Sequence, residues 1–280
     1  MKATERLQVD FAHSPDSDDA FMYYGIASGA VSTGDFVFNQ VMKDIQTLNE
    51  EAKEGKYEIS AVSFAAYPHI KSQYLLMPCG ASFGIECGPI VVVNEKQNVI
   101  ELNSITVAVP GYLTTAYLLL RLAMPEAKVI MLPFDEIVPA VQNGLVQAGL
   151  IIHEGQLTHL QSCLKKVFDL GQWWHEETHL PLPLGANVIR RDLGQQRILQ
   201  LKQILKESIV YSLQNRAAAM KYALSFARGM SEKTADQYIN MYVNDLSVDF
   251  GEVGRLAVKK LFNLASEANL CDAKFQSEFV

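Results

Sequence analysis

The stretch Gln147-Ala148-Gly149-Leu150-Ile151-Ile152-His153-Glu154-Gly155 decides the fold of this chain. Its apolar run has the character of a β-strand and ends abruptly on a histidine, a carboxylate and a glycine. In open α/β sheets the ligand lies beyond the carboxyl ends of the strands. Because histidine changes charge near neutral pH, His153 is a candidate general base. The alternative is that His153 only caps the strand and hydrogen-bonds a neighbouring loop.

Strand-like and helical segments alternate along the chain before this stretch. Strands are expected at 7–12, 36–41, 57–62, 89–94, 104–110 and 128–132, and helices at 20–27, 44–54, 64–71, 114–121 and 133–143. This alternation predicts layered α/β lobes with mostly parallel sheets. From residue 195 onward the pattern is almost wholly helical, so we place those helices on the first lobe. The expected division is residues 1–96 plus 190–280 for the first lobe and 97–189 for the second.

Composition and charge exclude several classes of protein. The chain has 280 residues, 49% hydrophobic and 20% charged, which is enough for two globular domains. A net charge of −7, without a basic cluster, argues against nucleic acid as a partner. No signal segment and no apolar run of membrane-spanning length is seen. The four cysteines are far apart and without a C-x-x-C pair, so the sequence predicts a cytoplasmic protein without a disulfide framework.

The segment His175-Glu176-Glu177-Thr178-His179 matches the H-E-x-x-H pattern of zinc hydrolases. That pattern requires a helix that presents both imidazoles to one ion. Pro181 and Pro183 end any helix directly after His179, and no obvious third ligand follows. We therefore expect an exposed loop here and no metal site.

Two strand-to-helix turns carry hydroxyl side chains. Thr114 and Thr115 lie in the first turn of an expected helix, where free amides and the helix dipole favour an anion, with the hydroxyls as extra donors. Ser63 repeats this arrangement in the first lobe. Each residue alone can be an ordinary N-cap. Together with His153 they predict a cleft between the lobes that takes a small carboxylate.

Six groups of residues, in order along most of the chain, carry a family resemblance. They are Asp44-Ile45-Gln46-Thr47-Leu48-Asn49, Ser63-Phe64-Ala65-Ala66-Tyr67, Ala108-Val109-Pro110-Gly111 with Thr114-Thr115-Ala116-Tyr117, Gly149-Leu150-Ile151-Ile152-His153-Glu154, Asp169-Leu170-Gly171 with Trp173-Trp174, and Leu180-Pro181-Leu182-Pro183-Leu184-Gly185. With these segments the chain resembles the 1,4-dihydroxy-6-naphthoate synthase family, which acts in the futalosine route of menaquinone biosynthesis.

The resemblance implies a two-lobed fold like that of the type II periplasmic binding proteins, with a cleft between the lobes. It also implies a carbon–carbon lyase that splits cyclic dehypoxanthinyl futalosine into dihydroxynaphthoate and a three-carbon sugar fragment. In the family, the residue matching His153 is the base, and the positions matching Val62, Ser63, Thr114 and Thr115 contact the substrate. No metal or organic cofactor is expected. The alternatives are a non-catalytic carboxylate-binding protein of the same fold and a paralogous enzyme acting on another aromatic acid.

The chain departs from the family in two places. The loop usually written Ser-Pro-Cys-Pro-Asn-Asp-Thr reads Ser14-Pro15-Asp16-Ser17-Asp18-Asp19-Ala20, and a common lysine is replaced by Ala61. Like charges ~4 Å apart repel by ~1 kcal/mol in water and ~4 kcal/mol near a protein surface. We therefore expect a substrate carboxylate to bind at Ser63 and the two threonines, away from the acidic loop. Asp18 and Asp19 can also be explained as helix caps.

Overall fold

The computed structural model describes residues 6–96, 105–227, 230–272 and 276–280. The chain divides into two compact units. The first consists of residues 1–83, 185–252 and 277–280, and the second of residues 84–184 and 253–276. Each unit has one sheet with helices packed against it. No helix among the described residues is long and apolar enough to cross a membrane.

The first unit is built on a sheet with the strand order β2-β1-β3-β11-β4, in which β5 also pairs with β11. Its strands are β1 (Leu7–His13), β2 (Phe36–Met42), β3 (Ile59–Ser63), β4 (Tyr74–Leu76), β5 (Ser82–Gly84) and β11 (Leu182–Arg190), the last two of which extend into the second unit. Its helices are α1 (Ser17–Met22), α2 (Tyr24–Ala27), α3 (Ile45–Ala52), α4 (Tyr67–Ile70), α9 (Gln195–Gln214), α10 (Arg216–Ala223), α11 (Glu232–Tyr242) and α12 (Asp245–Val248).

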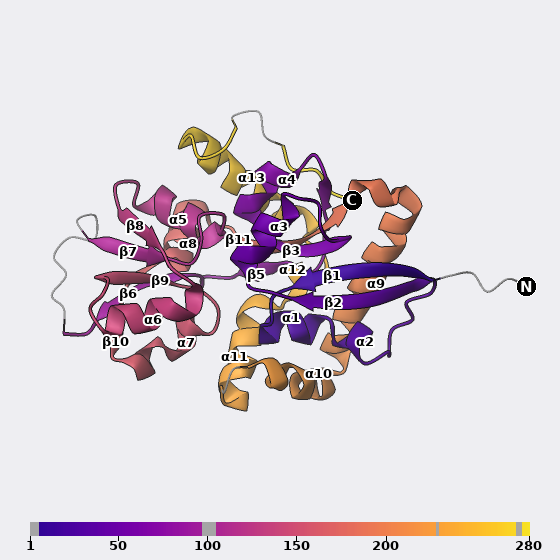
Figure 1. The fold of residues 1–280 in the computed structure, drawn as a ribbon, viewed down its shortest axis with the longest axis horizontal. Coiled ribbons are helices and arrows are strands. Elements are labelled where there is room, and N and C mark those ends of the chain that lie inside the picture. The colour runs from indigo at the N-terminus through magenta and orange to yellow at the C-terminus, as the bar shows by residue number, and fades with distance from the viewer. Residues whose placement is uncertain (1–5, 97–104, 228–229, 273–275) are drawn as a thin grey trace, which may run out of the picture. The chain divides into compact units, whose positions relative to one another are not determined.

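The second half of strand β1 is buried on both faces because helices cover both sides of the sheet. Val9 and Phe11 lie two residues apart and therefore on one face, where they join a core that includes Leu205 of α9. Ala12 lies on the other face and packs with Leu48 of α3. Figure 1 shows α1 and α2 on one side of β1 and β2, and α3 and α4 on the other.

The C-terminal residues return to the edge of this sheet. The amide of Leu76 donates to the carbonyl of Glu278 at 2.9 Å, and the amide of Val280 donates to the carbonyl of Leu76 at 3.0 Å. Between them, the ring of Phe279 packs edge to face on Phe250 with ring centroids 5.8 Å apart. The last residues therefore extend the first unit's sheet beyond β4.

The second unit has a sheet of order β10-β6-β9-β7-β8. Its strands are β6 (Ile90–Asn94), β7 (Thr106–Val109), β8 (Lys128–Met131), β9 (Ala148–Ile151) and β10 (Leu164–Asp169), and its helices are α5 (Thr115–Ala123), α6 (Phe134–Gln142), α7 (Gly155–Thr158), α8 (Leu170–Thr178) and most of α13 (Gly251–Glu267). Ile137 and Val141 of α6 form a core with Ile151 of β9. A Cβ on Gly149 would lie 2.5 Å from the Ile137 side chain, so only glycine allows α6 to approach β9 this closely.

The two sheets are mixed. Strands joined by helical crossovers are parallel, namely β1 with β2 and β3, and β7 with β8 and β9. By contrast, β6 and β11 run antiparallel to their partners. Strand β6 is the first strand after the crossing into the second unit, and β11 carries the chain back. Antiparallel pairing suits such strands because it requires no helical crossover.

Pro181 and Pro183 favour an irregular connector over residues 180–185, but β11 begins at Leu182. Pro183 is tolerated because the pairing of β11 with β3 and β4 starts only at Gly185, so no amide of those ladders is lost. Residues 84–96 and 253–267 pack with the second compact unit. The expected division into lobes, with residues 1–96 plus 190–280 in the first and 97–189 in the second, stays a prediction.

Candidate functional site

Three parallel strands of the second unit end at the same sheet edge. Strand β9 leads to His153, β7 leads to Thr114, and β8 leads to Phe134. These strands are neighbours in the order β9-β7-β8 and run parallel, so the residues that follow their carboxyl ends emerge together. Of these three residues, His153 and Thr114 were predicted from the sequence as site residues and Phe134 was not.

His153 is held in an uncommon backbone conformation. Its φ of 55° lies in the left-handed region, which a residue other than glycine rarely adopts. Its carbonyl accepts a hydrogen bond from the amide of Gln156 at 3.2 Å, at the start of α7. The half-buried imidazole packs edge to face on Phe134, with ring centroids 5.0 Å apart. Such strain persists only where the surrounding structure imposes it, and it is concentrated at functional sites.

Thr114 and Thr115 form the start of α5 and are each 2% exposed. The hydroxyl of Thr114 accepts a hydrogen bond from the amide of Tyr117 at 3.2 Å, as an N-cap does, and donates to the carbonyl of Gly111 at 2.8 Å. The hydroxyl of Thr115 donates to the carbonyl of Leu184 at 2.6 Å. Both hydroxyl hydrogens are therefore directed at carbonyls. An anion at this turn would therefore be bound by first-turn amides and not by the two hydroxyls.

Ser63 of the first unit is fixed by a residue that the sequence analysis missed. Asn49 of α3 is fully buried; its Oδ1 accepts from the amide of Ser63 at 2.8 Å, and its Nδ2 donates to the Ser63 hydroxyl at 3.1 Å. The hydroxyl thus accepts from Asn49 and keeps its own hydrogen for another acceptor. Neighbouring Val62 is fully buried, so its side chain belongs to the core. Asn49 lies in one of the segments that carry the family resemblance, which was the available signal.

The acidic loop follows β1, at the same edge of the first sheet as Ser63, because β1 and β3 are parallel neighbours. Asp16 is the N-cap residue of α1 but makes no side-chain cap bond. Instead, the Ser14 hydroxyl donates to Asp16. Asp19 accepts from the amide of Ser14 at 2.9 Å, and Asp18 accepts from the hydroxyl of Ser82 at 3.4 Å. Simple helix capping therefore does not account for these carboxylates.

The charges of this loop are strongly affected by burial. Asp16, Asp18 and Asp19 are 3%, 6% and 8% exposed. Burial, followed by repulsion from Asp18 and Asp16, raises the pKa of Asp19 well above its usual range. Burial likewise lowers the pKa of His13, whose ring bonds the Ser14 carbonyl at 2.8 Å. The loop thus favours a neutral imidazole and a protonated Asp19, and a protonated carboxyl can donate a hydrogen bond.

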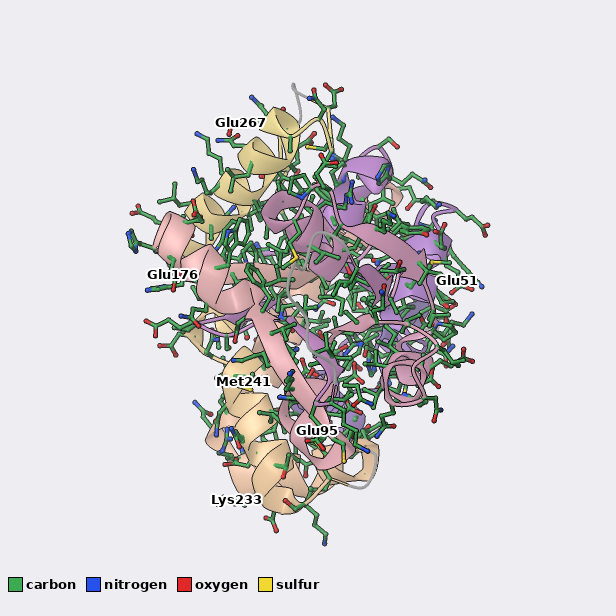
Figure 2. All side chains as sticks on the ribbon, turned by 90° about the vertical axis from the view of Figure 1, so that its left-hand side faces the viewer. Glu51, Glu95, Glu176, Lys233, Met241 and Glu267 are labelled. Carbon is green, nitrogen blue, oxygen red and sulfur yellow. The ribbon has the colours of Figure 1, made fainter. Side chains whose placement is uncertain are left out.

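The H-E-x-x-H segment is helical, contrary to the sequence-based expectation of a loop. Asp169 caps α8 by accepting from two first-turn amides, and the buried Trp174 donates from Nε1 to the carbonyl of Leu180 at 2.9 Å. These contacts stabilise the helix as far as Thr178. His179 then ends the helix in the left-handed conformation, before the two prolines. Glu176, labelled in Figure 2, is exposed. Among the described residues, no group of three His, Cys, Asp or Glu side chains could hold a metal ion.

Comparison with solved structures supports the fold. A crystal structure of a protein from Archaeoglobus fulgidus is 41% identical, with a TM-score of 0.90 over 94% of this chain and 98% of that chain. A Candida albicans protein described as having the generic periplasmic binding protein fold is 11% identical, with a TM-score of 0.72 over 95% and 91% of the two chains. The second likeness concerns the fold alone. The predicted two-lobed α/β fold of the periplasmic-binding-protein type is confirmed.

Comparison with known sequences gives the family. A 1,4-dihydroxy-6-naphthoate synthase from Thermus thermophilus is 38% identical over 266 residues, covering 95% of this chain and 96% of the relative. The synthase from Streptomyces coelicolor is 35% identical over 277 residues, covering 97% and 96%. A family model described as menaquinone biosynthesis matches residues 9–267. The chain therefore belongs to the menaquinone-biosynthesis family, as its sequence motifs predicted.

Proposed function

We propose that this protein is a carbon–carbon lyase that converts cyclic dehypoxanthinyl futalosine into 1,4-dihydroxy-6-naphthoate in the cytoplasm. The observation that carries the proposal is the match to two relatives named as this synthase, at 38% and 35% identity over 95% and 97% of the chain. The family model matches residues 9–267, a range that includes every residue that we assign below to the site.

In the proposed mechanism His153 is the general base. Its neutral imidazole takes a proton from the substrate, and the electron pair left behind forms a new double bond as the carbon–carbon bond breaks. The electron pair of the broken bond then takes the proton back from the imidazolium, and the three-carbon sugar fragment leaves. Aromatisation of the product favours this step. The left-handed backbone of His153 and its contact with Phe134 support the assignment, because both restrict the direction of the imidazole.

We further propose that Val62, Ser63, Thr114 and Thr115 contact the substrate. For the threonines, we assign binding of the substrate carboxylate to amides at the start of α5, where the helix dipole favours negative charge. For Ser63, we assign a hydrogen bond from the hydroxyl, which Asn49 leaves free to donate. Val62 has a buried side chain and would contact the substrate through its backbone.

The proposal is tested by incubating the purified protein with cyclic dehypoxanthinyl futalosine and detecting dihydroxynaphthoate by chromatography and mass spectrometry. His153→Ala is the matched control for background reaction. We expect product with the wild-type protein only. Saturable binding of the substrate without product would favour the non-catalytic alternative, and turnover of a different aromatic acid would favour the paralogue.

A further inference from the structure

The side-chain amide of Asn49 determines how the Ser63 hydroxyl can form hydrogen bonds. The backbone N–H of Ser63 can only donate, so the Asn49 atom that lies 2.8 Å from it must be the oxygen Oδ1. The other end of the same amide is then Nδ2, which also can only donate, and it lies 3.1 Å from the Ser63 hydroxyl oxygen. The hydroxyl oxygen therefore accepts a hydrogen bond from Asn49, and its own hydrogen is directed elsewhere.

The surrounding first unit holds Asn49 in this position. Asn49 is fully buried and Ser63 is 4% exposed, so neither group can exchange its partner for water. Helix α3, which carries Asn49, begins at an N-cap, Asp44, whose side chain accepts from two amides of the first turn. The adjacent Leu48 packs in a small core with Ala12 of β1. The orientation of the amide, and with it that of the Ser63 hydroxyl, is therefore fixed by the fold.

The hydroxyl hydrogen of Ser63 is available to a ligand. Ser63 is the N-cap residue of a short 3-10 helix at Phe64–Ala66, but its side chain forms no capping bond. Within the part of the chain that the structure describes, the hydroxyl donates to no acceptor. Gly185 of β11 lies directly opposite Ser63 in the antiparallel pairing, where side chains share a face of the sheet. Beyond its own chain neighbours, a Cβ on Gly185 would contact only the Val62 carbonyl, at 3.5 Å, so no described side chain fills this position beside Ser63.

We propose that Asn49 is a positioning residue that makes Ser63 select a substrate oxygen without a hydrogen, as in a carbonyl or carboxylate group. Such an oxygen accepts the hydrogen bond that the hydroxyl has left to give. A group that only donates, such as an N–H, would leave the buried hydroxyl hydrogen without a partner, which is unfavourable. This role of Asn49 rests on the proposed function, in which Ser63 contacts the substrate.

Asn49→Asp reverses one hydrogen bond and keeps the shape of the side chain. One oxygen of the introduced carboxyl can still accept from the Ser63 amide. When the carboxyl is ionised, its second oxygen can only accept, so the Ser63 hydroxyl donates to it and turns its lone pairs toward the substrate. When the carboxyl is protonated, it can donate to Ser63 as Asn49 does. Burial raises the pKa of a carboxyl, so both states can be reached in one pH titration.

The measurement is the steady-state turnover of cyclic dehypoxanthinyl futalosine by the full-length protein from about pH 5 to pH 9, a range that spans the ionisation of a buried carboxyl. We expect the KM of Asn49→Asp to exceed that of the wild type by about tenfold or more at alkaline pH and to approach it in acid. The loss should appear in KM more than in kcat, because the contact binds the substrate and takes no part in proton transfer. Comparison with the wild type at each pH removes ionisations that both proteins share, such as those of His13 and Asp19.

Two further variants separate this role from a general effect of the substitution. Ser63→Ala removes the donor and should raise KM about tenfold at every pH. In that background Asn49→Asp should raise KM little further, because both changes remove the same contact. Asn39→Asp adds the same charge at an exposed position of β2 and should leave KM and its pH dependence unchanged. Circular dichroism checks that each variant is folded.

A folded Asn49→Asp variant whose KM differs from that of the wild type by the same factor at every pH would overturn the role of Asn49, as would losses that add fully with Ser63→Ala. Both results would leave the proposed function in place. If Asn49→Asp does not fold, Ser63→Ala decides, because an unchanged KM overturns the donation to substrate and a raised KM supports it. A wild-type protein without turnover would instead contradict the proposed function, and this role of Asn49 with it.

Discussion

The backbone of His153 is the most specific feature of this chain at the residue scale. A non-glycine residue in the left-handed conformation costs of order 1–3 kcal/mol. Here the cost falls on His153, the second residue after β9, whose ring lies against Phe134. A strand that ended in glycine would avoid this strain but would carry no imidazole. The strained backbone is therefore understandable if the direction of the ring matters for the reaction.

Replacing His153 by alanine should lower kcat by ~10²–10⁴-fold, because that is the usual contribution of a positioned general base. Binding of a simple aromatic carboxylate should change little. Steady-state kinetics and calorimetric titration measure the two quantities separately. His153→Gly should be equally inactive but more stable than His153→Ala by about 1 kcal/mol, since glycine adopts the observed φ readily. Near wild-type turnover in either variant would remove His153 from the mechanism.

Asp19→Asn should make the protein more stable at neutral and alkaline pH. The pKa of Asp19 is raised in the folded state by burial and by Asp18 and Asp16, so folding favours the protonated carboxyl. Stability from this group is fully present below the pKa of an unfolded aspartate and is lost as pH rises through the higher folded pKa. Asparagine keeps an acceptor for the Ser14 amide and cannot ionise.

Urea unfolding between pH 4 and pH 9 measures this effect. The advantage of Asp19→Asn over the wild type should grow with pH across that range. Asp35→Asn, which removes one negative charge from an exposed position, is the control for the change in net charge. Equal stability of Asp19→Asn and wild type at every pH would show that Asp19 ionises normally.

At the scale of elements, the carboxylate of Glu51 in α3 forms hydrogen bonds with the segment after β2 and the segment before β3. Glu51, labelled in Figure 2, accepts hydrogen bonds from Lys43 after β2, at 2.6 Å, and from Tyr57 before β3, at 2.7 Å. Lys56 is a third donor. Burial alone would raise the pKa of Glu51, but these three hydrogen bonds outweigh it and lower the pKa to about 2.

Glu51→Gln should destabilise the protein by about 1–2 kcal/mol at pH 7, because several donors share one partly buried carboxylate. The folded pKa lies below the unfolded value of 4.5, so this stabilisation is present above pH 4.5 and is lost as pH falls toward 2. The difference in unfolding free energy should therefore shrink in acid. Glu54→Gln, an exposed change just after the same helix, should have almost no effect. A similar loss in both variants would contradict this role.

The sequence predicted elements best where the local pattern and the tertiary environment agree. Strand β9 is an apolar run bounded by polar residues, and its end just before His153 can be predicted directly from the sequence. Helix α8 was predicted as a loop because the prolines that follow it suggest a break. Trp174 stabilises the helix through a hydrogen bond to the carbonyl of Leu180, which lies beyond the end of the helix. Asn49 could not be recognised as a partner of Ser63, because that contact joins α3 to β3 and depends on tertiary packing.

At the scale of the whole molecule, the chain completes its first unit with its last residues. The carbonyl of Glu278 accepts from the Tyr67 hydroxyl at 3.0 Å, and its carboxylate pairs with Arg191 at 2.8 Å. Phe279 adds an apolar contact with Phe250. The tail is therefore part of the folded unit even though its sequence has no pattern that predicts a strand.

Deletion of residues 277–280 should lower the unfolding free energy by about 2–3 kcal/mol, through lost apolar burial and lost hydrogen bonds at β4. Thermal and urea denaturation measure this loss. Arg191→Gln removes only a surface ion pair and should cost less than about 1 kcal/mol. If the deletion lowered the unfolding free energy by no more than Arg191→Gln does, residues 277–280 would contact the first unit without stabilising it.

The position of β11 has a consequence for how the protein is made. In the sheet, this strand lies between β3 and β4. Both of these strands come earlier in the sequence, and residues 84–181 lie between them and β11 along the chain. A ribosome therefore releases β1 to β4 long before the strand that joins them. During that interval β3 and β4 each expose an unpaired edge, which is the kind of surface that aggregates or recruits chaperones. We expect the yield of soluble protein to respond to the rate of translation and the supply of chaperones more strongly than its final stability suggests.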